Sequence, residues 1–246
     1  MPVAVVTGAS SGIGAALCRE LRSRGWYVVG LSRSPARDAE EHEECDVADR
    51  DAVDAAAARV LERHPKLELL VNNAGIAGRG DFLDLPPDHI EALVQTNYLG
   101  SVWCLRAFLP GLGVGSAVVN VVSVAGTVAA GPYSASKHAQ LAFSRSIAIE
   151  LRPRGIHVLS VLPGFVETPG FPQRGRIPFP LSTLVIDPPF VARRTLDALE
   201  HSRHEIYVPR WYRPAAWLQA LFPAVIARRR ATRAWAGSRS RTRARS

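Results

Sequence analysis

The chain has 246 residues, of which 47% are hydrophobic and 21% are charged, and this balance excludes a wholly disordered protein. Of its 30 basic side chains, eight arginines lie in residues 228–246, which contain no acidic residue; the first 227 residues therefore hold 22 basic and 22 acidic side chains. The net charge of +8 thus does not predict a basic surface on the folded part. Cys18, Cys45 and Cys104 are widely separated, which favours neither a disulfide framework nor a zinc site and fits a reducing compartment.

Apolar runs alternate with helical segments along the chain. The first run, at 3–6, leads through a glycine-rich turn to a helix predicted at about 12–24. Further strands are predicted at 26–31, 67–71, 117–122, 156–162 and 205–208, and further helices at 49–64, 88–108, 133–151 and 189–200. Such alternation predicts a parallel sheet covered on both faces, and right-handed crossovers make it a doubly wound α/β fold of three layers in a single domain.

The glycine-rich segment carries the first chemical signal. Residues 7–14 read Thr-Gly-Ala-Ser-Ser-Gly-Ile-Gly, so the backbone can turn sharply and approach a pyrophosphate closely. The N-terminus of the helix that follows then offers free N–H groups to the anion. An ordinary glycine-rich turn is the alternative, but the strand, turn and helix context predicts nucleotide binding.

The end of the second predicted strand indicates which nucleotide binds. An NAD site usually places an acidic residue here to hold the ribose 2′-hydroxyl, but the next acidic residue in this chain is Asp38. Ser32 and Arg33 stand in its place, and an arginine can hold a 2′-phosphate through charge-assisted hydrogen bonds. A solvated surface arginine is the alternative. We therefore expect NADP rather than NAD.

Residues 133–137 read Tyr-Ser-Ala-Ser-Lys at the start of a predicted helix. Tyr133 and Lys137 are four residues apart and so lie on one face. A nearby ammonium stabilises a phenolate and lowers a tyrosine pKa from about 10 toward neutral pH, which general acid–base catalysis requires. Lys137 is one of two lysines in a chain that otherwise uses arginine. Taken alone, a tyrosine and a lysine at this spacing could also be an ordinary pair on the surface of a helix.

Four more features follow in order: Asn-Asn-Ala-Gly at 72–75, Asn97, Ser123, and Pro-Gly-Phe-Val-Glu-Thr at 163–168. With the motifs above they resemble the short-chain dehydrogenase/reductase family, in its single-domain subtype, over residues 2 to about 209. The resemblance implies a Rossmann-like fold, no metal, and hydride transfer between NADP(H) and an alcohol, ketone or aldehyde.

The resemblance also implies roles for individual residues. Ser123 would orient the substrate oxygen, Tyr133 would exchange the proton, Lys137 would hold the nicotinamide ribose, and Asn97 would help carry protons to solvent through a water. Residues 46–47 would contact the adenine, 73–75 would lie behind the cofactor, and the 163–168 segment would lie on its nicotinamide side. The implied cofactor-binding set is Gly8, Ser10, Ser11, Gly12, Ile13, Gly14, Ser32, Arg33, Asp46, Val47, Asn73, Ala74, Gly75, Tyr133, Lys137, Pro163, Gly164, Val166 and Thr168.

Three features depart from the family pattern. The stretch 123–133 is shorter than usual, which trims the wall of the substrate pocket. The segment 34–45 leaves little room for the helix usually found after the second strand, and Pro132 restricts how the next helix begins. An ordinary strand-end serine at Ser123 and an asparagine that bridges backbone groups at Asn97 remain open alternatives.

The part of the chain beyond the catalytic domain, which we place at 1–209, divides in two. Residues 210–227 form an apolar extension, and 228–246 form a basic tail that we expect to be disordered. The uncharged run 214–227 is too short for a bilayer span of about 20 residues. Three uses of the extension compete: packing on its own domain or a second subunit, covering the substrate pocket, or lying on a membrane surface.

We therefore predict an NADP-dependent oxidoreductase that acts in the cytoplasm, as a homodimer or homotetramer, on a small alcohol or carbonyl compound that is hydrophobic if the apolar extension lies beside the pocket. The apolar strand directly after Met1 and Pro2 indicates no signal peptide. Contact with a membrane through the C-terminal tail stays open, and nucleic acid is not an expected partner. The alternative is a catalytically silent NADP-binding regulatory or scaffold protein; the presence of all four catalytic residues argues against it. The short chain argues against an isomerase or dehydratase of the extended subtype.

Overall fold

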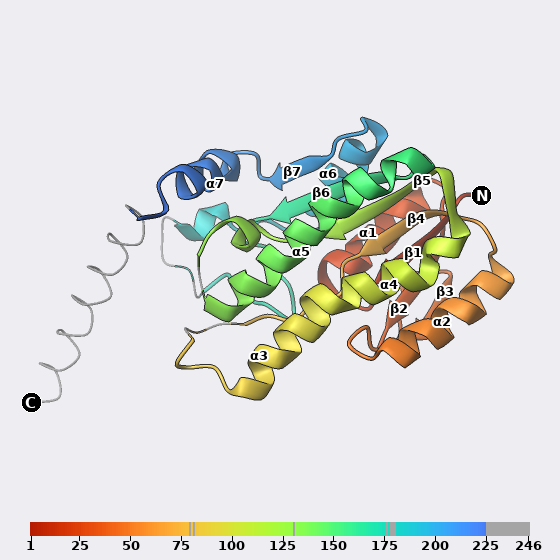
Figure 1. Cartoon of the computed structure of the whole chain (residues 1–246), viewed down its shortest axis with the longest axis horizontal. Coiled ribbons are helices and arrows are strands. Elements are labelled where there is room, and N and C mark those ends of the chain that lie inside the picture. The colour runs from red at the N-terminus through yellow and green to blue at the C-terminus, as the bar shows by residue number, and fades with distance from the viewer. Residues whose placement is uncertain (79, 81, 130, 176, 178–180, 225–246) are drawn as a thin grey trace, which may run out of the picture.

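The computed structural model describes residues 1–78, 80, 82–129, 131–175, 177 and 181–224, and a seven-stranded parallel sheet lies at its centre (Figure 1). The strands pair in the order β3-β2-β1-β4-β5-β6-β7, which confirms the doubly wound α/β fold. Their bounds are β1 Val3–Thr7, β2 Tyr27–Ser32, β3 Glu41–Glu44, β4 Leu67–Asn72, β5 Leu112–Val121, β6 His157–Pro163 and β7 Glu205–Val208. The order reverses between β1 and β4, and the carboxyl ends of strands at such a switch point are where open α/β sheets bind ligands.

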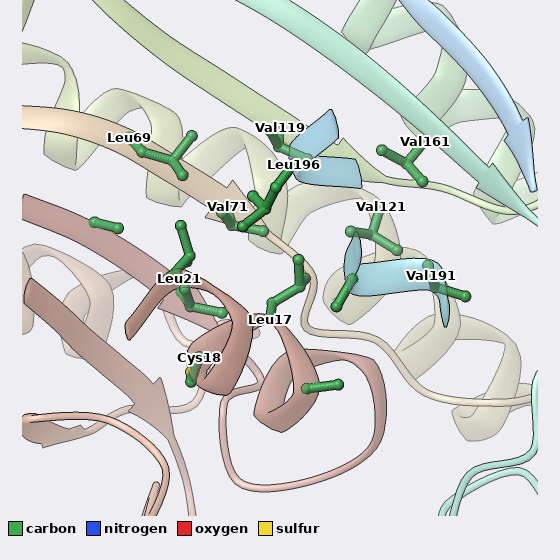
Figure 2. Close-up of a cluster of buried hydrophobic side chains, with 14 of the residues drawn as sticks. Leu17, Cys18, Leu21, Leu69, Val71, Val119, Val121, Val161, Val191 and Leu196 are labelled. Carbon is green, nitrogen blue, oxygen red and sulfur yellow. The ribbon is translucent and has the colours of Figure 1, made fainter. Parts of the chain in front are cut away.

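Helices cover both faces of the sheet, as the apolar strands predict. The helices are α1 Gly12–Ser23, α2 Arg50–Arg63, α3 Pro87–Val94, α4 Gly100–Phe108, α5 Gly131–Glu150, α6 Pro188–Glu200 and α7 Tyr212–Leu221. Successive strand residues face opposite sides, so neighbours on one strand join different clusters. Val71 packs with Leu17 of α1 and Leu196 of α6 (Figure 2), whereas Leu70 belongs to the cluster that contains Phe108 of α4. Each strand must therefore be apolar on both faces.

The edge strand β3 is missing from the sequence prediction. Its residues Glu41–Glu44 read Glu-His-Glu-Glu, and this strand pairs in parallel with β2. Charged side chains are common on edge strands but carry no apolar period, so the pattern could not reveal it. The acids are held by α2, because Glu43 accepts hydrogen bonds from Arg59 and Arg63. Residues 33–40 contain no helix, as the short 34–45 segment predicts.

The predicted helix at 88–108 is divided. Its two halves, α3 and α4, are joined by a π-helical turn over Gln95–Leu99. A π-turn contains one residue more than an α-turn, so it changes the direction of the side chains within it, and such turns often occur at functional sites. Asn97 lies in this turn and is fully buried.

Helix α5 begins at Gly131, two residues before the predicted start. Pro132 therefore lies in the first turn, where its missing N–H would have had no partner within the helix. Helix α7 forms inside the apolar extension, and its residues Tyr212 and Ala216 pack on the domain together with Leu162. The basic tail at 228–246 lies outside the described residues. None of the described helices is long and apolar enough to cross a membrane.

Candidate active site

The glycine turn after β1 has the backbone that a phosphate cradle needs. Gly8 and Gly12 have φ of +64° and +56°, a region that favours glycine. A Cβ on Gly14 would lie 2.1 Å from the Gly8 carbonyl oxygen, so no side chain fits there. Ser11 caps α1 by position, but its side chain makes no capping hydrogen bond in the described structure. The first N–H groups of α1 are thus open to an anion.

The residues expected around the adenine end lie beside this turn. Gly8 N donates to the carbonyl of Leu31 at 2.8 Å, which ties the turn to the end of β2. The Ser32 hydroxyl donates to the Ser34 carbonyl at 2.7 Å. The Arg33 guanidinium is 71% exposed and lies 3.6 Å from an Asp46 carboxylate oxygen, so it is placed at this edge yet open to solvent.

Val47 was expected to contact the adenine, but its side chain is buried and packs against Gly100. A Cβ on Gly100 would lie 2.8 Å from Val47 Cγ2. The close approach packs the chain after β3 onto the first turn of α4. Asp46, the residue before it, uses its side chain to accept a hydrogen bond from Ala48 N at 3.0 Å.

The segment after β4 connects the glycine turn with the buried polar residues. The Thr7 hydroxyl accepts from both Asn73 N and Ala74 N at 3.0 Å. The Asn73 amide donates to the Thr7 carbonyl at 2.9 Å. Gly75 comes next, and a Cβ there would be 3.0 Å from Asn97 Oδ1 and 3.6 Å from Lys137 Nζ. The segment therefore lies between the turn and the lysine.

The side chain of Asn97 is hydrogen bonded to neighbouring residues. Its Oδ1 accepts from Ile76 N at 2.8 Å, and its amide donates to the Ile76 carbonyl and to the Ser136 hydroxyl, both at 3.1 Å. Ser136 in turn donates to the Tyr133 carbonyl at 2.8 Å. Asn97 thus bridges backbone groups, which was the alternative to a proton-carrying role, and it links the segment after β4 to the first turn of α5.

Lys137 is buried and held from two sides. Its Nζ donates to the Gln140 side-chain oxygen at 2.7 Å and to the Val121 carbonyl at 3.3 Å. Burial lowers the pKa of Lys137 to about 7. Gln140 is itself fully buried and donates to the Ser101 hydroxyl at 2.9 Å. The sequence prediction omits Gln140, although a polar amide three residues after the lysine on the inner face of the helix was a signal for it.

Ser123 and Tyr133 meet at the end of β5. Burial raises the pKa of Tyr133, and a hydrogen bond with the Ser123 hydroxyl acts in the opposite direction. Ser123 also accepts from Ala125 N at 3.0 Å, which places it at the start of the short 3-10 turn Val124–Thr127. We expected Lys137 to lower the pKa of Tyr133, and this is not what the structure gives. Desolvation of the phenol dominates, and the ammonium is bound to Gln140 instead.

Aromatic rings gather near Tyr133 and in the loop after β6. The Phe171 ring lies 6.3 Å from the Tyr133 ring, centroid to centroid, and the Phe165 ring is 6.4 Å from that of Tyr212. Gly164 lies under Tyr212, since a Cβ on it would be 2.0 Å from the Tyr212 ring. Tyr212, from the apolar extension, is a second residue that the sequence prediction missed at the site.

The remaining predicted positions belong to the loop after β6. Pro163 is the last residue of β6, and Val166 is buried and forms an isolated bridge to Ile186. The Thr168 methyl lies close to Gly12, where a Cβ would be 3.2 Å away, so this loop reaches the glycine turn. The Thr168 hydroxyl accepts from Phe171 N at 3.0 Å. The structure thus gathers the four predicted catalytic residues and the glycine turn at one edge of the sheet.

Comparisons with known proteins agree with this arrangement. The family model "short chain dehydrogenase" matches residues 2–176. A putative ketoacyl reductase of Streptomyces coelicolor is 36% identical over 186 residues, which is 68% of this chain and 71% of that protein. A 3beta-hydroxysteroid dehydrogenase of Mediterraneibacter gnavus is 33% identical over 184 residues, covering 68% of this chain and 67% of its own length.

A solved structure gives the same result. A short chain dehydrogenase of Burkholderia cenocepacia in complex with NADP is 30% identical, with a TM-score of 0.79 over 93% of this chain and 96% of that chain. Similar structures include complexes with NADP and with NAD, so the likeness alone does not choose the nucleotide. Fold, edge geometry and sequence relatives agree, and the chain belongs to the short-chain dehydrogenase/reductase family of oxidoreductases.

Proposed function

We propose that this protein transfers a hydride between NADP(H) and an alcohol or carbonyl substrate, with Tyr133 as the residue that exchanges the proton. The observation that carries the proposal is the placement of Tyr133: it is hydrogen bonded to Ser123, lies one helical turn before Lys137, and stands at the edge that holds the glycine turn. Geometry of this kind suits general acid–base catalysis at a substrate oxygen.

A nicotinamide nucleotide fits the residues present. Glycines at positions 8, 12 and 14 leave the space that side chains would fill, and the uncapped start of α1 supplies N–H donors for a pyrophosphate. The exposed Arg33 guanidinium would hold a 2′-phosphate, which supports NADP over NAD. When bound, the nucleotide supplies or accepts the hydride.

The residues of the chain then divide the remaining work. In reduction, Tyr133 gives its phenolic proton to the oxygen of the carbonyl while the carbon receives the hydride, and the product is an alcohol; oxidation runs in the opposite direction. Ser123 donates a hydrogen bond to the same oxygen. In this proposal the Lys137 ammonium, which donates to Gln140 and to the Val121 carbonyl, would also hold the nicotinamide ribose. Asn97 would support proton supply by fixing the segment at Ile76.

The side chains around the site indicate the class of substrate. The Phe171 ring lies near that of Tyr133, and the rings of Phe165 and Tyr212 pack together at Gly164 in the same loop after β6, so an apolar ketone or secondary alcohol fits better than a charged one. Two of the relatives named above are called a putative ketoacyl reductase and a 3beta-hydroxysteroid dehydrogenase, names that refer to compounds with a largely apolar body. We also expect a homodimer or homotetramer, a state that size measurements in solution would settle.

A panel of apolar and polar carbonyl compounds with NADPH and with NADH tests the proposal, with oxidation of the nicotinamide as the signal. We expect turnover of an apolar ketone with NADPH. Tight NADPH binding without turnover of any compound in either direction would instead favour a silent cofactor-binding protein. Preference of the unaltered protein for NADH would refute the NADP assignment.

A further inference from the structure

Helix α7 has two unlike faces. Tyr212 and Ala216 point toward the domain, where Tyr212 covers Gly164 at the substrate side of the site. The opposite face carries Trp217, Leu218, Leu221 and Phe222, which are between 52% and 71% exposed. Trp217, Leu218 and Leu221 lie together on the helix surface at spacings of one, three and four residues, and Phe222 follows directly at the end of the helix. A cluster of four large apolar side chains in water marks an interaction surface, which we call the α7 outer face.

A groove of 580 Å³ adjoins the α7 outer face, between α6, β7 and α7. It is lined by Trp217 and by four arginines, Arg194, Arg203, Arg210 and Arg213. None of these four forms an ion pair with another described residue. The Arg213 guanidinium lies 4.9 Å from the centre of the Trp217 ring, so the positive charge stands directly beside the apolar surface.

The groove holds four arginines against two carboxylates, Asp197 and Glu205. Asp197 is ion-paired with Arg24 at 2.9 Å, and this guanidinium also pairs with Glu20 and Glu200. Glu205 is ion-paired with Arg145 at 2.9 Å. The sequence continues the same trend, since residues 228–246 add eight arginines and no acidic residue. The region as a whole therefore combines exposed apolar side chains with uncompensated positive charge.

We propose that the α7 outer face and the arginines beside it bind an anionic lipid surface. Such a partner satisfies both features, because its acyl region accepts Leu218 and Leu221 while its headgroups attract the arginines. A nucleic acid would leave the leucines exposed. A second copy of this chain, related by a two-fold axis, would bring the arginines of both copies together and so repel.

If the proposed function holds, a lipid surface bound at the α7 outer face would lie close to the active site. The inner face of α7 covers Gly164 and reaches Phe165, in the loop after β6 that also carries Phe171, a neighbour of Tyr133. A bilayer against the outer face would lie next to the substrate side of the site. An apolar ketone or alcohol dissolved in the membrane would then reach the site without crossing bulk water.

Co-sedimentation with vesicles tests the contact without any substrate, so its outcome is independent of the catalytic proposal. The full chain is mixed with vesicles of phosphatidylcholine alone or with an equal share of phosphatidylglycerol. We expect binding to the anionic vesicles only. Raising salt from about 0.1 M to about 1 M shortens the Debye length from about 10 Å to about 3 Å and should weaken binding. Absence of binding to anionic vesicles at low salt would overturn the proposal.

A double variant on the α7 outer face and a control double variant elsewhere test where the lipid contact lies. Leu218→Ser with Leu221→Ser should lower the partition coefficient about tenfold or more, because two buried aliphatic side chains are lost. The matched control changes Val114 and Ile149 to serine, exposed positions at the start of β5 and the end of α5. An unchanged partition coefficient for the α7 pair would refute the proposal. So would a fall in oligomer mass in sedimentation caused by that pair alone, which would make the face a subunit contact.

A charge variant keeps the test decisive if the serine pair does not fold. Arg210→Gln with Arg213→Gln should lower the partition coefficient at low salt by about fivefold for each arginine. Arg152→Gln with Arg154→Gln is the matched control, because these exposed arginines precede the amino end of β6, whereas α7 follows the carboxyl end of β7. Equal losses for both pairs would show that binding follows total charge rather than the α7 surface, and would overturn the assignment.

Discussion

Gln140 offers the sharpest test of how the buried lysine is kept charged. Gln140→Leu removes the acceptor 2.7 Å from Lys137 Nζ and leaves one neutral acceptor, the Val121 carbonyl at 3.3 Å. A hydrogen bond to a charged group contributes about 1.5–3 kcal/mol, and one pKa unit equals about 1.4 kcal/mol. The loss should therefore lower the pKa of Lys137 by about one to two units from its value of about 7.

The sign of the effect on activity follows from the proposed role. If the ammonium form of Lys137 is the active one, activity falls as pH rises through its pKa. The alkaline limb of kcat/KM should then move to lower pH in Gln140→Leu. Gln140→Glu is the matched control, because a carboxylate at the same distance favours the ammonium and should move the limb to higher pH. Unchanged limbs in both variants would refute the reasoning.

Stability gives a second readout of the same variant. A lysine whose pKa is lowered in the folded state binds fewer protons there than in the unfolded chain, so stability rises with pH above its folded pKa. In Gln140→Leu this rise should begin below pH 7, and the loss of stability relative to the unaltered protein should shrink as pH increases. Urea unfolding between pH 5.5 and pH 8 measures it, below the range in which the buried thiols would titrate in the unfolded chain.

Three further changes test other parts of the site. Tyr133→Phe should leave nucleotide binding intact and lower turnover about 10²- to 10⁴-fold, measured as kcat with the best substrate; near-normal kcat would remove Tyr133 from the mechanism. Arg33→Ala should weaken NADPH much more than NADH in fluorescence titrations, and equal losses would show that Arg33 holds no 2′-phosphate. Gly14→Ala should abolish tight binding of either nucleotide, because the new methyl group would lie against the Gly8 carbonyl; unchanged affinity would contradict the assigned cradle.

The sequence predicted most of this fold because both faces of the sheet are covered. Strands such as Leu67–Asn72 and His157–Pro163 are then apolar almost throughout, and the glycine turn and the Tyr133–Lys137 spacing are local patterns. The edge strand Glu41–Glu44 lacked that signal, because its stability comes from pairing with β2 and from the arginines of α2. The π-turn at Gln95–Leu99 also has no local marker.

The missed site residues share a different cause. Gln140 accepts a hydrogen bond from Lys137 within α5 and donates one to Ser101 of α4. Tyr212 belongs to the apolar extension, and its ring covers Gly164. The contacts of Gln140 with Ser101 and of Tyr212 with Gly164 join residues far apart in the sequence, so local spacing does not reveal them. One face of the extension packs on its own domain, which is one of the uses that the sequence left open, while the other face remains exposed.

A chain of buried hydrogen bonds across the sheet also helps to fix the position of Tyr133 and Lys137. Asn72 of β4 donates to Asn120 of β5 at 2.9 Å, Asn120 donates to Ser144 of α5 at 2.8 Å, and Ser144 lies 2.7 Å from the Ser160 hydroxyl of β6.

All four of these side chains are buried. A helix whose inner face carried only leucine could rotate or slide at little cost, because apolar packing is not directional. Here a shift of α5 by one residue would break Asn120–Ser144 in the middle of the sheet and leave buried amides without partners, at about 1–3 kcal/mol for each. The chain of polar residues therefore fixes the register of α5, and through it the place where a phenol and an ammonium meet the edge of the sheet.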